Sequence, residues 1–268
     1  MAFFPLLSVM KTSGFCTVYN YPPNDWEESN SGSKMLWALY SNGKKWVSRY
    51  LCSIKEGENK TIFYDQFKLN KELNFSPIIV LQLRKTPLSD ELDELPDQEF
   101  IFNKIPDWRS TVGFRLNEAQ ASYQGEINPF PKKATLLTFH PFIQYKKTKN
   151  YFVFLNLETS PVIRKCYLEI YKSSSKEFIE KIEIKSCHAN VIPIDKYAFE
   201  PNELPLFICR EMGGIPFGFG ISYNDDMLSL EHTHPPASFS VHGERFEVQK
   251  KIKSLWFNEL SLNDENKI

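Results

Sequence analysis

Short runs of alternating apolar and polar residues recur along most of this 268-residue chain. They are rich in aromatic and β-branched residues, and turn-forming stretches such as Ser41-Asn42-Gly43 and Ser173-Ser174-Ser175 separate them. Many short strands at close spacing are typical of antiparallel sandwiches or barrels, so the sequence predicts a mainly β fold. The clearest runs are Lys34–Tyr40, Val47–Ile54, Lys60–Phe67, Ile78–Leu83, Tyr151–Leu157, Cys166–Tyr171, Lys181–Lys185, Ala189–Ile194, Leu206–Arg210 and Phe217–Tyr223.

One segment near the C-terminus has helical rather than strand periodicity. In Gly243–Leu260, the apolar residues Val248, Ile252, Leu255 and Trp256 fall on one helical stripe. We therefore expect a C-terminal helix over residues 243–260. Its apolar stripe either packs on the sheet of its own unit, which we favour, or binds a partner.

A weak internal repeat is visible when the two halves are compared. The matched segments are Lys34–Tyr40 with Asn150–Asn156, Arg49–Ile54 with Lys165–Ile170, Ile78–Leu81 with Leu206–Cys209, Gly113–Glu118 with Gly220–Asp225, and Ser122–Glu126 with Ser229–Thr233. Unrelated strands also alternate, so duplication and chance resemblance both stay open. The repeat predicts two similar antiparallel β-sandwich-like units, residues 1–140 and residues 141–268, with the helix in the second unit.

The composition narrows the classes of function. A hydrophobic content of 42% with 24% charged residues is ordinary for a folded globular protein. The net charge of −1 provides no basic field for nucleic acid, and no apolar run is long enough to span a membrane. The cysteines are odd in number and form no Cys-x-x-Cys pair, which indicates reduced thiols and a cytoplasmic location. They are Cys16, Cys52, Cys166, Cys187 and Cys209.

The densest chemical signal is the segment Glu231-His232-Thr233-His234. On a strand, residues two apart point to the same face, so His232 and His234 could present two nitrogen ligands to one divalent metal. Iron, manganese, nickel and zinc all accept such ligands, and a metal needs at least a third one. The candidates for a third ligand are His242, His140, His188 and a carboxylate of the paired strand.

The histidine segment also has a purely structural interpretation. The prolines Pro235 and Pro236 follow it directly and would stop the strand, and the two imidazoles could then hydrogen-bond to backbone groups. In the repeat, Ser122–Glu126 is the counterpart and also runs into proline. Function at these two hairpin tips would involve Tyr123 and Glu126 in the first half and Glu231 in the second.

Aromatic residues make up 15% of the chain, which suits β-structure and also surfaces that stack on sugars. Trp37 lies in an apolar strand and Trp256 in the helical stripe, so we expect both in the core. Trp26 and Trp108 lie in loop-like sequence beside carboxylates. These two tryptophans either cap an edge of the core or contact a ligand.

Two functions of different classes follow from these observations. The first is a soluble β-rich binding protein for carbohydrate or another protein, with Glu231, Glu126, Tyr123, Trp108 and Trp26 as candidate ligand contacts. The second is a metal-dependent enzyme that acts on a small hydroxylated or sugar substrate. Its metal ligands would be His232, His234 and His242. Few acid–base residues cluster elsewhere, and this favours the binding protein.

Overall fold

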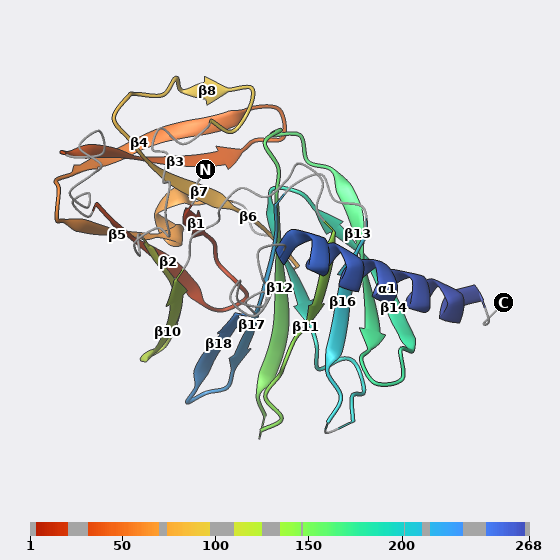
Figure 1. Ribbon diagram of the computed structural model, residues 1–268. Helices are drawn as coiled ribbons and strands as arrows, with labels where there is room; N and C mark the ends of the chain where they lie inside the picture. Colours follow the sequence, from red (N-terminus) through yellow and green to blue (C-terminus); the bar gives the residue numbers. More distant parts are fainter. Residues whose placement is uncertain are drawn as a thin grey trace.

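Four antiparallel sheets and one C-terminal helix make up the described part of the chain (Figure 1). The computed structural model describes residues 4–20, 32–69, 74–96, 110–124, 135–145, 147–200, 202–210, 215–232 and 245–265. The predicted fold class, mainly β with a C-terminal helix, is confirmed. Within the described residues, no helix is both long enough and apolar enough to cross a membrane.

The first unit consists of two sheets. Sheet I has the strand order β1-β7-β3-β4-β8, and sheet II has the order β10-β9-β2-β5. A 3-10 helix, η2 (Tyr64–Phe67), follows β5. The strands are β1 (Phe4–Leu6), β2 (Ser13–Tyr19), β3 (Lys34–Ser41), β4 (Trp46–Ile54), β5 (Asn59–Phe63), β7 (Ile79–Arg84), β8 (Glu91–Leu92), β9 (Ser110–Leu116) and β10 (Ala119–Gln124).

The second unit also consists of two sheets. Sheet III has the order β11-β16-β13-β14, and sheet IV has the order β18-β17-β12-β15-β6. The strand β6 comes from the first half of the chain, so backbone hydrogen bonding ties the two units together. The strands are β6 (Phe75–Pro77), β11 (Leu136–Phe139), β12 (Lys149–Leu157), β13 (Lys165–Lys172), β14 (Phe178–Lys185), β15 (His188–Pro193), β16 (Pro205–Cys209), β17 (Ile215–Tyr223) and β18 (Leu228–His232).

The two units have the same strand order. The four strands β1-β7-β3-β4 of sheet I correspond to β11-β16-β13-β14 of sheet III, and sheet II corresponds to β18-β17-β12-β15 of sheet IV. Corresponding strands follow one another in the same sequence order, except that β6 and β8 have no counterpart. This agreement supports an internal duplication. It also favours a unit boundary before Leu136 rather than at residue 140, because β11 pairs with β16 in the second unit.

Equivalent tight turns support the same alignment. The amide of Gly57 donates to the carbonyl of Asn20 at 2.7 Å, and the amide of Cys187 donates to the carbonyl of Asn156 at 2.7 Å. Gly57 and Cys187 both have positive φ, 80° and 56°, so each turn needs one left-handed residue. Asn20 therefore corresponds to Asn156.

The correspondence of Asn20 with Asn156 shows which residues of sheet II and sheet IV are equivalent. Thr17 and Val153 each lie three residues before their asparagine, so they correspond. Thr17 pairs with Thr111 on β9, and Val153 pairs with Phe219 on β17. Thr111 and Phe219 are therefore counterparts as well.

The predicted repeat was right for some strands and wrong for others. The matches of β7 with β16 and of β10 with β18 agree with the strand order, whereas β12 corresponds to β2 rather than to β3, and β13 to β3 rather than to β4. The match of Gly113 with Gly220 is one residue out of register, because Gly113 corresponds to Ile221. Alternation alone does not distinguish neighbouring strands, which explains these shifts.

Alternate side chains of the sheet I strands point into two different hydrophobic cores. In β3, Leu36 and Ala38 point into the sandwich between sheets I and II. Trp37 and Leu39 point the other way and contribute to a core shared by the two units. Both faces of the sheet are therefore covered at β3, and the middle of this strand is apolar.

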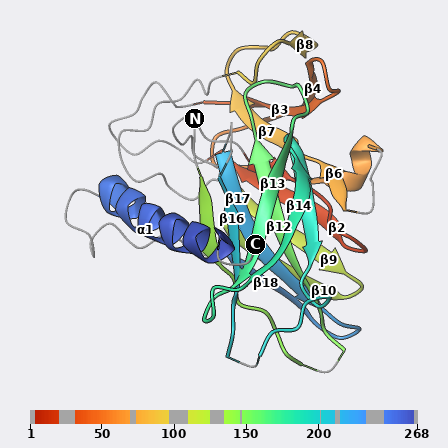
Figure 2. The same cartoon turned by 90° about the vertical axis from the view of Figure 1, so that its right-hand side faces the viewer.

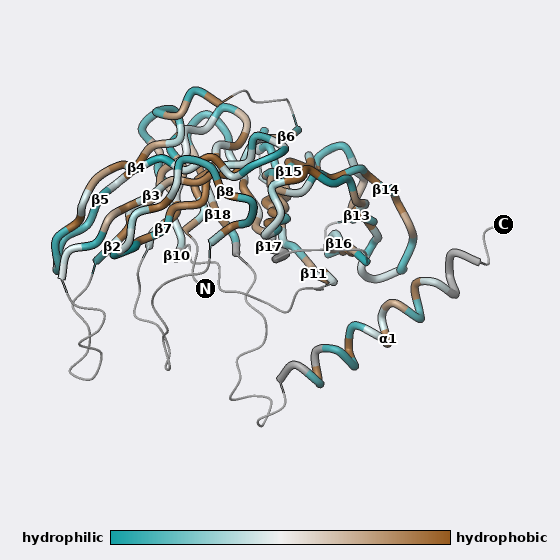
Figure 3. Tube along the Cα trace, turned by 90° about the horizontal axis from the view of Figure 1, so that it is seen from above, coloured by the Kyte–Doolittle hydropathy of each residue, from teal (hydrophilic) through white to brown (hydrophobic). Residues whose placement is uncertain are grey.

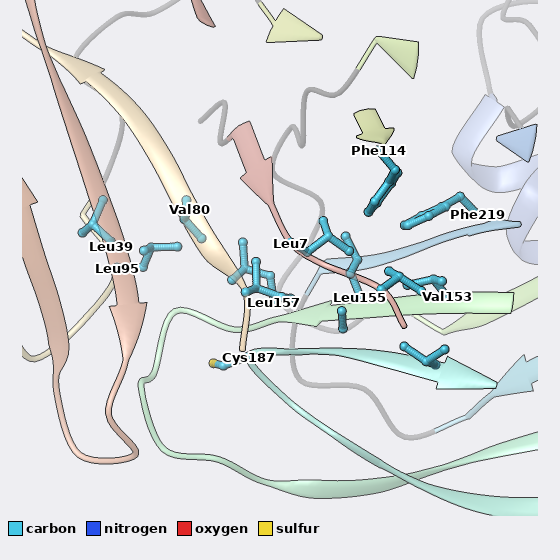
Figure 4. Close-up of a cluster of buried hydrophobic side chains, with 14 of the residues drawn as sticks. Leu7, Leu39, Val80, Leu95, Phe114, Val153, Leu155, Leu157, Cys187 and Phe219 are labelled. Atoms are coloured by element: carbon cyan, nitrogen blue, oxygen red, sulfur yellow. The ribbon is translucent and has the colours of Figure 1, made fainter. Parts of the chain in front are cut away.

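Sheet IV forms the other side of the shared core. In β12, Phe152 and Phe154 point into the sandwich between sheets III and IV. Val153 and Leu155 point toward the first unit, where Leu7 lies beside Leu155 (Figure 4). Burial of this apolar area stabilises the arrangement of the two units.

Helix α1 (Arg245–Glu265) packs on the outer face of sheet III, beside β16 (Figure 2). Seen from above, it lies on the side of the second unit away from sheet II (Figure 3). Trp256 contacts Phe139 with ring centroids 5.3 Å apart, and Leu260 is fully buried. The predicted stripe was wrong for Ile252 and Leu255, which are 46% and 68% exposed. The prediction was right for Trp256, and the packed face runs from Trp256 to Leu260 rather than through Ile252 and Leu255.

Candidate binding face

Each of the four sheets has an outer face that turns away from its own sandwich core. The outer faces of sheets I and IV cover each other in the shared core, and helix α1 covers that of sheet III. Among the described residues, no strand packs across the outer face of sheet II, and η2 reaches only its edge, where Asp65 accepts a hydrogen bond from Ser13 at 2.7 Å. We call this surface the sheet II face, and it is the candidate functional site.

A row of threonine hydroxyls crosses the sheet II face. The strand register aligns Thr61 of β5, Thr17 of β2 and Thr111 of β9. The Oγ1 atoms of Thr17 and Thr61 are 2.8 Å apart, and the hydroxyl of Tyr19 lies 3.4 Å from Oγ1 of Thr111. All four side chains are half-buried, so this row offers hydroxyl groups at the surface.

The next row is aromatic. Phe63, Phe15 and Gly113 are aligned across β5, β2 and β9. A Cβ atom at Gly113 would lie 2.3 Å from Cζ of Phe15, so only glycine allows the Phe15 ring to lie over β9. The rings of Phe15 and Phe63 have centroids 6.4 Å apart and form an apolar patch between polar rows.

Arg115 lies over this aromatic patch. Its guanidinium carbon is 5.3 Å from the centroid of Phe15 and 5.0 Å from that of Phe63, and its Nε donates to Gln120 at 3.0 Å. The side chain is exposed, and within the described ranges no carboxylate pairs with it. The two rings and the amide hold the guanidinium in place, which leaves its terminal N–H groups for a ligand.

The counterpart positions on sheet IV show how different the two faces are. Thr17 and Thr111 correspond to Val153 and Phe219, which are both fully buried in the shared core. Phe219 stacks on Phe114 with centroids 5.7 Å apart. The same framework thus carries a dry interface in one unit and an open face of hydroxyl, aromatic and cationic groups in the other.

Three of the predicted ligand residues come shortly before or after strands of sheet II in the sequence. Trp26, Trp108 and Glu126 themselves lie outside the described residues. The described strands next to them end at Tyr19, at Ser110 and at Gln124. Ser110 is opposite Val18, and Gln124 is opposite Thr111, so these ends are neighbours in the sheet. Contact of the three residues with a ligand stays a prediction.

Tyr123, the fourth predicted ligand residue, is on the inner side of sheet II. It packs against the core of the first unit, and its ring lies 5.7 Å from the ring of Phe219. Burial of the hydroxyl raises its pKa above the ordinary tyrosine value, and nearby Cys16 adds to the effect. This packing stabilises the junction of β10 with the second unit.

The histidine segment lies at the end of β18. Glu231 is exposed and is opposite Gly220, and the backbone of His232 is opposite that of Phe219. The positions of His234 and His242 fall outside the described ranges. In the parts of the chain that are described, no group of three or more His, Cys, Asp or Glu side chains is arranged to hold a metal. The proposed metal ligands therefore stay a prediction.

Two of the candidate third ligands lie away from His232. His140 is fully buried, and its ring occupies the space above Gly220, on the opposite side of sheet IV from the Phe219 row. His188 is on β15, three strands from β18, which corresponds to about 14 Å. Its Nδ1 is 2.8 Å from the carbonyl oxygen of Ser186.

Sequence reasoning missed the threonines and Arg115 of the sheet II face. A signal was present, because in Cys16-Thr17-Val18-Tyr19 apolar residues alternate with residues that carry hydroxyl groups. Alternation of that kind indicates a strand with one open face. Comparisons with models of protein families, with curated proteins and with solved structures found no match.

Proposed function

We propose that the protein is a non-catalytic binding protein that holds an acidic oligosaccharide on the sheet II face. The observation that carries this proposal is the exchange of apolar for polar residues between corresponding sheets. Val153 and Phe219 are buried in the shared core, whereas Thr17 and Thr111 are at a surface that no described element covers.

The residue types on the face favour a sugar. Threonine and tyrosine hydroxyls donate and accept hydrogen bonds, which suits the hydroxyl groups of a carbohydrate. Phe63 is half-buried at the edge of the aromatic patch and offers an apolar surface to the C–H groups of a sugar ring. A row of hydroxyls beside an aromatic row therefore matches the two sides of an oligosaccharide.

Arg115 favours an acidic sugar over a neutral one. Its guanidinium is exposed, is held by two rings and Gln120, and has no carboxylate partner among the described residues. A planar guanidinium binds a carboxylate in a bidentate manner, and such charge-assisted bonds are about twice as strong as neutral ones. We therefore assign Arg115 to the carboxylate of a uronic acid unit.

The test is calorimetric titration with two oligosaccharides of similar size, hexagalacturonate as the acidic probe and maltohexaose as the neutral probe. We expect the protein to bind hexagalacturonate more tightly. Arg115→Gln should weaken this binding about tenfold or more, because a hydrogen bond to a charged group contributes about 1.5–3 kcal/mol.

The matched control is Arg49→Gln. Arg49 is also exposed and lies 5.8 Å from the centroid of an aromatic ring, that of Phe67, but it is on β4 of sheet I. This variant should bind hexagalacturonate like the unchanged protein. Equal loss in both variants, or no binding of either probe by the unchanged protein, would contradict the proposal.

A further inference from the structure

Helix α1 carries apolar residues on two different sides. On the inner side, Trp256, Phe257 and Leu260 pack on sheet III. On the outer side, the large apolar side chains of Ile252 and Leu255 are exposed to solvent. The contact with sheet III therefore accounts for the inner residues only, and the outer residues need a separate explanation.

The outer residues have the spacing of a coiled-coil seam. Val248, Ile252 and Leu255 follow one another at intervals of four and three residues, and the next two steps of this alternation reach Glu259 and Leu262 in the sequence. Residues spaced in this way occupy positions a and d of a heptad and lie along one side of a helix. We call Val248, Ile252 and Leu255 the outer seam.

Contacts on the inner side fix the orientation of α1 on sheet III. Nζ of Lys253 donates a hydrogen bond to the carbonyl oxygen of Thr135 at 2.6 Å. Lys176 forms an ion pair with Glu259, and its Nζ is 5.2 Å from the ring centroid of Trp256. The outer seam is thus presented by a helix that is already ordered, which lowers the entropy lost when a partner binds.

The charges of α1 are divided between its two halves. Residues 245–253 include four basic residues and one acidic residue, whereas residues 254–265 include three acidic residues and no basic one. If two α1 helices pack in an antiparallel manner, the basic half of each lies beside the acidic half of the other. Parallel packing would bring halves of like charge together. The charges therefore match a second copy of this helix in the antiparallel orientation.

The stability of the single helix does not explain this division of charge. The N-terminus of a helix is the positive end of its dipole, so acidic residues are favourable near the N-terminus and basic residues near the C-terminus. Helix α1 has the reverse arrangement, and its last turn contains no basic residue. An antiparallel neighbour offsets this arrangement, because it places opposite charges beside each half.

We propose that the protein forms a homodimer through the outer seams of two antiparallel α1 helices, with Ile252 of each copy beside Leu255 of the other. The seam is short, so we expect a weak and reversible dimer. Helix α1 lies on the side of the second unit away from sheet II (Figure 3), so this dimer leaves both sheet II faces open. The proposal does not depend on sugar binding.

The experiment is sedimentation equilibrium of the full chain from about 1 μM to about 1 mM, the range in which a weak interface is half-occupied. We expect the average mass to rise from that of one chain toward that of two. Leu255→Glu places a carboxylate of each copy in the seam and should weaken the dimer at least tenfold. Because Leu255 is 68% exposed, the circular dichroism spectrum and the urea midpoint of this variant should not change.

The matched control is Ser254→Glu, which adds the same charge at the preceding exposed residue, outside the outer seam. This variant should dimerise like the unchanged protein. Salt tests the orientation: raising NaCl from about 0.1 M to about 1 M shortens the Debye length from about 10 Å to about 3 Å and should weaken an antiparallel dimer.

Three results would overturn the proposal. The first is the mass of a single chain at every concentration. The second is an equal effect of Leu255→Glu and Ser254→Glu on the dimer. The third is a dimer that becomes stronger in 1 M NaCl, since this would indicate that like charges meet, as in a parallel pair.

Discussion

Sheets II and IV have the same strand order but opposite surroundings. On sheet IV, the outer face carries Val153, Leu155 and Phe219, and the first unit covers it. On sheet II, the corresponding face carries Thr17 and Thr111, and no described element covers it. The two sheets share a strand order, so strand order does not determine the residue types of their outer faces. The residue types depend on whether another part of the protein covers the face. The open face is therefore where we place binding.

The largest expected effect on stability comes from a substitution in the covered face of sheet IV. This substitution leaves the sheet II face unchanged. Phe219→Ala removes a fully buried ring that contacts Phe114 and Tyr123, so it should destabilise the protein by about 3–5 kcal/mol. Its counterpart Thr111→Ala should lower the free energy of unfolding by less than about 1 kcal/mol. Urea unfolding followed by tryptophan fluorescence measures both. Similar losses in the two variants would mean that the two faces do not differ as described.

A smaller effect comes from exchanging side chains of similar shape between the faces. Val153→Thr places a hydroxyl in the shared core and should cost about 1–3 kcal/mol. Thr17→Val loses the hydrogen bond to Thr61 at a half-buried site and should cost about 1 kcal/mol or less. The same urea titration gives both values. A larger loss for Thr17→Val would reverse the comparison.

Much of the fold could be predicted from the sequence, because each strand carries its own alternating pattern. Runs such as Tyr151–Leu157 and Leu206–Arg210 lie where β12 and β16 form. The C-terminal helix was also predictable from its period. Its packed face was not, because Ile252 and Leu255 are as apolar as Leu260, and only the shape of sheet III decides which of them is buried.

The candidate site was harder to predict. Thr17, Thr61 and Thr111 are far apart in the sequence and meet only through the pairing of β5, β2 and β9. A threonine on one strand has no special meaning until its neighbours are known. Arg115 is similar, since its position depends on Phe15 and Phe63 from two other strands. The histidine segment attracted attention because its chemistry is local in sequence.

The most direct test of binding on the sheet II face is methyl NMR of the protein titrated with hexagalacturonate. Thr17, Thr61 and Thr111 report on the open face, and Val153 and Ile221 report on the covered face of sheet IV. We expect the threonine methyl signals to shift with ligand concentration while those of Val153 and Ile221 stay in place. Shifts confined to Val153 and Ile221, or unchanged threonine signals at saturating ligand, would contradict the assignment of binding to this face.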